Sequence, residues 1–168
     1  MRLLRTIRLD ESDVHVFEVA AAPGEWAIPG GFAFARDDAS TLVGRRYQAF
    51  RRGFLGLGSF GWSTLVQVAP IDRETFDALV ERLAAHFVER YGAPDLAAAR
   101  PVAREELAFA AAVADRPPGT LVTVERTLEE GGVRERFRTV DPARARRLRV
   151  FVPVVEEEPP ATDGGGEG

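Results

Sequence analysis

Residues 71–94 read IDRETFDALVERLAAHFVERYGAP, and this stretch decides the predicted fold class. Five apolar side chains recur at the spacing of one helix face, namely Phe76, Leu79, Val80, Leu83 and Phe87. Asp72 stands at the N-cap position, and Ile71 before it is placed to pack on Phe76. Gly92 then supplies a helix stop. The stretch therefore predicts an amphipathic helix over Arg73–Tyr91.

Downstream, the sequence predicts one more helix and a hairpin. Asp95 to Asp115 is rich in alanine, and Leu107, Ala110, Val113 and Ala114 form its expected packing face. Pro101 predicts a kink or a break there, because proline removes a backbone donor. Thr120–Leu128 and Val133–Val140 then alternate as two strands across the turn 129–132, which is typical of a β-hairpin.

Upstream, short apolar runs separated by turn residues predict strands. These runs are Leu3–Leu9, Val14–Val19, Trp26–Ile28, Phe32–Ala35 and Ser63–Val68. Between them, Ser40–Arg52 has helical spacing, with Ser40 as the expected cap. The sequence thus predicts one α+β domain over residues 1–155, in which a mostly antiparallel sheet packs against two or three helices.

The end of the chain differs in composition. Arg144–Val155 changes from basic to apolar, which favours an edge strand within the domain or a docking segment for a partner. Residues 156–168 are acidic, rich in glycine and proline, and free of aromatic residues, so we expect a disordered tail.

The composition excludes several function classes. The 168 residues carry a formal charge of −4 and contain no cysteine, lysine or asparagine. The missing residue types exclude disulfides, thiol nucleophiles, cysteine-ligated metals, Schiff bases and Walker A lysines. The acidic balance argues against a nucleic-acid partner. No apolar run resembles a signal peptide or a membrane span, so we expect a cytoplasmic protein.

The stretch Leu55–Trp62, LGLGSFGW, contains the G-x-G-x-x-G pattern of nucleotide-binding loops. A dinucleotide site needs this pattern to open a helix, whereas Trp62–Val68 is predicted as a strand. A kinase loop needs a lysine on the following strand, and the chain has none. The pattern is therefore interpreted as a tight strand–turn–strand in which glycines permit positive φ or close packing.

Other chemistry-bearing side chains form no catalytic or metal-binding pattern. His15 and His86 lack a second ligand at metal spacing, and we expect His15 to point to solvent. Adjacent carboxylates such as Glu105 and Glu106 are expected on solvated surfaces. No catalytic residue, metal or cofactor is predicted.

Two binding hypotheses remain. Arg45, Arg46, Arg51 and Arg52 concentrate positive charge on one predicted helix, and with the segment Leu148–Val155, including Phe151, they favour an accessory protein that binds another protein. The alternative is a domain, or an enzyme of unfamiliar type, that binds a small anionic ligand near Gly53–Gly61 with Trp26, Trp62 and an arginine.

Several phrases resemble an uncharacterised family of small bacterial proteins. They are 1–9, AFRRGFLG at 49–56, SFGWSTLV at 59–66, GAPDLAAAR at 92–100 and EELAFA at 105–110. The resemblance covers residues 1–140 and supplies no site residue. It implies an association with gene neighbourhoods for assembling molybdenum-dependent formate dehydrogenases, and hence an accessory role.

Overall fold

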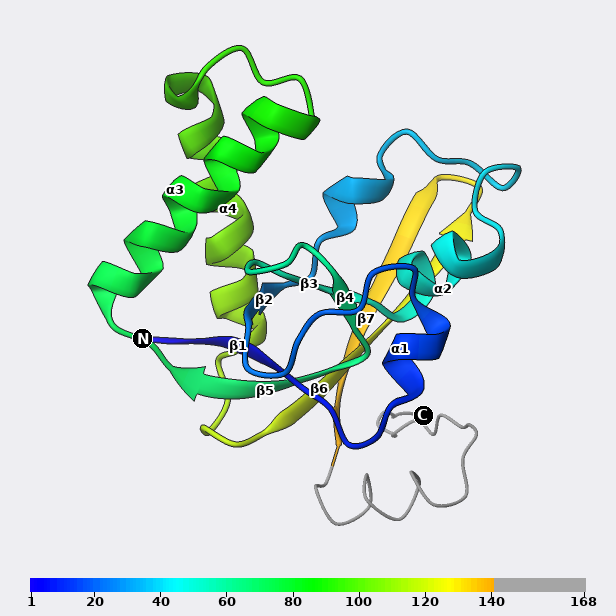
Figure 1. Ribbon diagram of the computed structural model, residues 1–168, viewed down its shortest axis with the longest axis horizontal. Coiled ribbons are helices and arrows are strands. Elements are labelled where there is room, and N and C mark those ends of the chain that lie inside the picture. The colour runs from blue at the N-terminus through cyan, green and yellow to red at the C-terminus, as the bar shows by residue number, and fades with distance from the viewer. Residues whose placement is uncertain (141–168) are drawn as a thin grey trace.

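The structure is a computed structural model that describes residues 1–140, and its centre is a curled antiparallel sheet (Figure 1). Within these residues the strands follow the order β4-β3-β2-β1-β5-β6-β7, and every paired strand is antiparallel to its neighbour. The strands are β1 (Arg2–Ile7), β2 (Trp26–Ile28), β3 (Phe54–Gly56), β4 (Trp62–Ser63), β5 (Leu65–Pro70), β6 (Leu121–Glu129) and β7 (Gly132–Val140).

Four α-helices and one 3₁₀ helix accompany the sheet in the described residues. They are α1 (Ser12–Val16), η1 (Gly31–Phe34), α2 (Gly44–Arg52), α3 (Arg73–Arg90) and α4 (Leu96–Val113). Helices α3 and α4 lie side by side, whereas α1 and α2 lie on the other side of the view (Figure 1). This arrangement confirms the predicted α+β class, with more helices than the two or three expected.

The two long helices form where the sequence predicted them. Asp72 Oδ1 accepts the backbone N–H of Thr75 at 2.7 Å, which caps α3, and Asp95 caps α4 in the same way. Of the two outcomes predicted at Pro101, a kink or a break, the break is wrong, because α4 continues through this residue as one helix. Packing of its buried face stabilises α4 despite the proline. The buried side chains are Ala99, Ala103, Leu107 and Ala110.

Three local predictions in the first third of the chain are wrong. The predicted strand Val14–Val19 contains the end of helix α1, and Phe32–Ala35 lies largely in η1. The carboxylate of buried Asp13 accepts the N–H and hydroxyl of Thr64 at 3.2 and 2.8 Å, so a distant contact holds α1 in place. Ser40 donates to Asp38 in a turn and does not cap α2, which begins at Gly44.

A buried arginine joins the two ends of the curled sheet. Residues 123–129 of β6 extend past its pairing with β5, and there Arg126 is 1% exposed. Its Nη1 donates to the carbonyls of Phe50 and Gly53 at 2.9 and 3.0 Å, and its Nη2 donates to the carbonyl of Pro29. Arg126 thereby fastens β6 to the segments that flank α2 and η1.

The hydrophobic core has two parts within residues 1–140. The larger part fills the space between the sheet and helices α3 and α4, and the smaller part lies under α1, η1 and α2. Phe17, Phe34, Leu42, Ala49 and Phe50 make up the smaller part. The half-buried ring of Trp62 packs against both parts, so it connects them.

Candidate functional site

The four arginines predicted on one helix have different surroundings in the structure. Arg46 forms a two-pronged ion pair with Asp37, with N–O distances of 2.9 and 2.5 Å, and also donates to the carbonyl of Ala33. The hydrogen bonds from Arg46 hold the pKa of Asp37 below its usual value. Arg46 therefore fixes the loop between η1 and α2, and it is not available for a partner.

The remaining arginines of α2 lie toward solvent. Arg45 is exposed and Arg52 is half-buried, and neither side chain forms a hydrogen bond or an ion pair with another residue of 1–140. Arg51 contacts Glu125 of β6, with an N–O distance of 3.4 Å. This contact places the end of α2 beside the β6–β7 hairpin.

Strand β7 adds arginines that sequence reasoning did not connect with α2. Arg136 lies directly opposite Glu125 in the β6–β7 register, so the two side chains share one face. Arg134 and Arg138 share this face because side chains alternate along a strand. Arg138 contacts Glu125 at 3.9 Å and Arg134 contacts Glu129 at 3.2 Å. We name this group the arginine surface; its members are Arg51, Arg134, Arg136 and Arg138.

The arginine surface has an excess of positive charge. Its four arginines are accompanied by Glu125 and Glu129, and Arg136 forms no ion pair within residues 1–140. Strand β7 is also the last strand of the sheet in the described residues. The arrangement thus combines a row of cations with a strand edge that is unpaired within residues 1–140. The alternation of arginine at 134, 136 and 138 was the sequence feature that could have predicted this surface. Which residues of β6 they face depends on the hairpin register.

The aromatic candidates do not gather around these arginines. Trp26, on β2, stacks with Arg5, whose guanidinium lies 4.4 Å from the ring centre. Trp62 packs 5.1 Å from Phe34 and covers two glycines of the core, which is a structural role. Phe151 and the rest of Leu148–Val155 lie outside the described residues, as do the predicted tail and its boundary.

The glycine-rich turn between β3 and β4 already holds an anion, the carboxylate of Glu25. One of its oxygens accepts the backbone N–H groups of Gly58 and Ser59 at 2.9 and 2.8 Å. The other accepts the Ser59 hydroxyl and the N–H of Ala22 at 2.8 and 2.7 Å. Burial raises the pKa of Glu25, but these hydrogen bonds outweigh it and bring the pKa below its usual value. The turn binds the side chain of Glu25, which lies directly before β2, where a nucleotide loop would bind phosphate.

The same turn confirms the predicted strand–turn–strand, with one difference. A Cβ on Gly61 would lie 2.8 Å from backbone atoms of residues 20 and 21, so close packing requires this glycine. The positive φ belongs to Phe60, at +56°, and not to Gly56, Gly58 or Gly61. A bulky residue in this region is strained. The strain coincides with an unusual position of the Phe60 ring.

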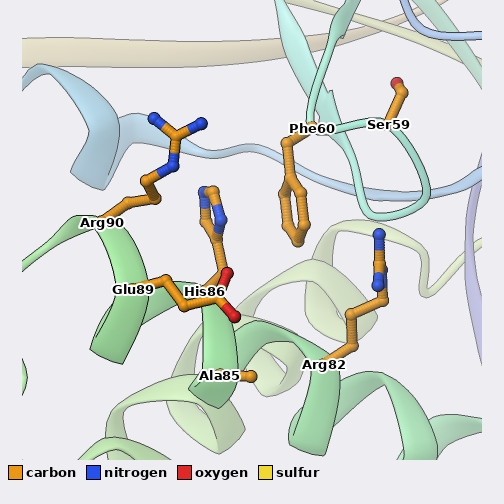
Figure 2. A pocket seen from close by; sticks show the side chains of 7 residues that line it. All are labelled: Ser59, Phe60, Arg82, Ala85, His86, Glu89 and Arg90. Carbon is orange, nitrogen blue, oxygen red and sulfur yellow. The ribbon is translucent and has the colours of Figure 1, made fainter.

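The Phe60 ring lies over helix α3 and borders a surface pocket of about 340 Å³ (Figure 2). It stacks on His86 with ring centres 3.6 Å apart and planes 3° apart. The guanidinium of Arg82 lies 5.0 Å from the ring centre, and Figure 2 shows the ring between His86 and Arg82. Seven residues line the pocket: Ser59, Phe60, Arg82, Ala85, His86, Glu89 and Arg90. Sequence reasoning placed a pocket near this turn, but with tryptophans.

The sequence also led to predictions about the histidines and the adjacent carboxylates, and it predicted no membrane span. His15 is exposed as expected, whereas Glu106 is half-buried, and burial raises its pKa, with Glu135 and Glu105 adding to the effect. The expectation of a solvated Glu106 is therefore wrong. Among residues 1–140, no group of three or more potential metal-ligating side chains occurs, and no helix is long and apolar enough to span a bilayer.

Fold and surface together define an α+β protein with a curled antiparallel sheet, a cationic edge and a shallow pocket. Residues 1–156 match the family of unknown function DUF6505, and the chain belongs to this family. The match extends beyond residue 140, so it includes the basic-to-apolar segment that the resemblance had left out. The comparisons with curated proteins and with solved structures found no match.

Proposed function

We propose that this protein acts by binding, as a cytoplasmic accessory protein that holds an acidic segment of a protein partner on the arginine surface. One observation supports the proposal most strongly: Glu125 is surrounded by Arg51, Arg136 and Arg138, so the surface keeps positive charge that its own carboxylates do not balance. Arginine is suited to carboxylates because its planar group donates two parallel hydrogen bonds.

The spacing of the arginines favours an extended partner segment. Residues two apart on a strand are about 6.6 Å apart and point the same way. A partner strand with acidic side chains at alternate positions would face Arg134, Arg136 and Arg138 in turn. Its backbone would pair with the outer edge of β7, as in recognition by strand addition. The hypothesis that residues 148–155 occupy this edge or dock to a partner concerns residues outside the described part, and it stays a prediction.

Peptide binding tests the proposal. The probe is a fluorescent nine-residue peptide in which glutamate alternates with threonine, and its control carries glutamine at each glutamate. We expect saturable binding of the acidic peptide that weakens as salt rises, because exposed charges are screened. Charge reversal in Arg136→Glu should weaken it by about tenfold or more, which corresponds to about 1.4 kcal/mol.

A matched variant separates this surface from general charge. Arg36 is exposed in the loop after η1 and forms no ion pair in residues 1–140, so Arg36→Glu changes the net charge equally. Equal losses in the two variants would refute a defined site, as would equal binding of the glutamine peptide. The implied association with formate dehydrogenase assembly is examined afterwards, by testing acidic segments of such enzymes in the same assay.

A further inference from the structure

We infer that the pocket between the β3–β4 turn and α3 is a separate binding site for a small organic anion that carries a phosphate or carboxylate group. It is built from Phe60, His86 and Arg90, with Ser59 and Glu89 at its border. Its volume of about 340 Å³ lies at the small end of the range for ligand sites. The site is independent of the arginine surface, because it uses none of the same residues.

The pocket is held in shape by contacts that leave its cationic side open. Arg82 donates through Nε to the carbonyl of Leu57 and through Nη2 to that of Gly58 at 2.5 Å, which ties the turn to α3. Glu25 holds the same turn from the other side. The turn therefore presents Phe60 in a fixed, strained position, and such strain is frequent at binding sites.

The anion would bind between Arg90 and His86. Arg90 lines the pocket, and its side chain forms no hydrogen bond or ion pair with another residue of 1–140. Figure 2 shows its guanidinium on the side of the His86 ring that faces away from Phe60. The Phe60 stack fixes the plane of the imidazole, so its N–H group can donate at the ring edge. An imidazole N–H held in one plane, beside a charged guanidinium that has no partner in residues 1–140, is suited to an oxyanion.

The remaining border residues favour an organic ligand over a bare inorganic ion. The carboxylate of Glu89 would repel a purely anionic ligand, but it can accept a hydrogen bond from a hydroxyl group. The Ser59 hydroxyl donates to Glu25 and accepts the N–H of Gly61, which leaves one lone pair for a ligand. A ligand that combines one oxyanion with neighbouring hydroxyl groups satisfies both ends of the pocket.

His86 reports directly on occupancy. Burial lowers its pKa, and the neighbouring Arg90 and Arg82 add to this effect, while Glu89 opposes it. A bound anion would stabilise the protonated ring and raise the pKa of His86. The imidazole C–H signals in an NMR titration measure that pKa, and the exposed His15 provides a reference signal in the same spectrum.

The experiment titrates the full chain with glycerol 3-phosphate, glycerate, inorganic sulfate and neutral glycerol. We expect saturable shifts of the His86 signal, and a higher His86 pKa, with glycerol 3-phosphate or glycerate, and the stronger of the two identifies the anionic group. Arg90→Gln should weaken binding by about tenfold or more, because a hydrogen bond to a charged group is lost.

Arg45→Gln, on α2, is the matched control and should bind as the unaltered protein does. Circular dichroism and the unchanged His15 signal confirm that each variant is folded. The inference is refuted if neither organic anion shifts the His86 signal more than glycerol does. It is equally refuted if Arg90→Gln and Arg45→Gln bind alike, or if sulfate binds as tightly as the organic anions.

Discussion

Arg126 and Glu135 form an ion pair inside the curl of the sheet, with Arg126 Nε 2.6 Å from a Glu135 carboxylate oxygen. The arginine lies on β6 and the glutamate on the neighbouring strand β7, in directly opposed register. Burial lowers the pKa of Arg126, and Glu135 opposes this, yet an arginine remains charged. A buried charge is therefore compensated by one carboxylate and three backbone carbonyls.

Replacing Arg126 by Met should be strongly destabilising. The change leaves the carbonyls of Pro29, Phe50 and Gly53 without their donor and the Glu135 carboxylate without its cation. Breaking such a buried pair costs about 3–5 kcal/mol. Urea unfolding measures the free energy of unfolding, with Arg134→Gln as the exposed control on β7. A loss below 1 kcal/mol would show that Arg126 does not fasten the sheet.

The role of Arg126 marks the limit of what the sequence could predict. Local signals suffice for α3, where Asp72 caps the helix and the apolar stripe sets its buried face, and for the β6–β7 hairpin. Arg126 lies in a polar stretch that is typical of a solvated strand end. Its burial depends on three carbonyls that are at least 73 positions distant in the sequence.

In the candidate sites, too, some features follow from the local sequence and others depend on contacts between distant residues. The charge on α2 could be predicted, but the loss of Arg46 to Asp37 and the gain of Arg136 depend on packing. The pocket near the glycine-rich turn could be placed roughly from sequence. The Phe60–His86 stack could not, because it joins residues 26 positions apart through a strained backbone. Tertiary contacts decide which side chains become available.

Gly61→Ala should destabilise the fold, whereas Gly131→Ala should not. A Cβ on Gly61 would meet the backbone of Ala20 and Ala21 at 2.8 Å, and backbone atoms cannot move away cheaply. A Cβ on Gly131, in the β6–β7 turn, has no atom within 4 Å. We expect a loss of about 1–3 kcal/mol for the first change, as for other overpacked sites. Thermal unfolding of both variants tests this prediction. Equal midpoint temperatures would contradict the close packing at Gly61.

Glu25→Gln should remove stability that depends on pH. The amide keeps one acceptor for Gly58 and Ser59, but its NH₂ group faces the N–H of Ala22. We expect a loss of about 1–2 kcal/mol at pH 7. The folded pKa of Glu25 is below its usual value, so its contribution is present above the unfolded pKa, about 4.3, and is lost as the pH falls through the folded pKa.

Urea unfolding at pH 7 and at pH 3 tests the Glu25 prediction. The difference between the unaltered protein and the variant should shrink at the lower pH, because the unaltered carboxylate is then partly protonated. Asp72 has a lowered pKa through its own helix cap, so the comparison uses the difference between the two proteins at each pH. If the difference in unfolding free energy between the two proteins is the same at pH 7 and pH 3, the ionised carboxylate of Glu25 is not the source of the stability.

Arg46→Gln and Arg45→Gln should differ although the residues are neighbours. Arg46 holds Asp37, whose side chain is only 8% exposed, and it also bonds the carbonyl of Ala33. Its removal leaves a nearly buried carboxylate without its cation, and we expect a loss of about 1–3 kcal/mol. Arg45 is exposed and forms no ion pair within residues 1–140, so its change should stay within about 0.5 kcal/mol. Urea unfolding measures the free energy of unfolding of the two variants. Similar losses of stability would contradict a specific role of the Arg46–Asp37 ion pair.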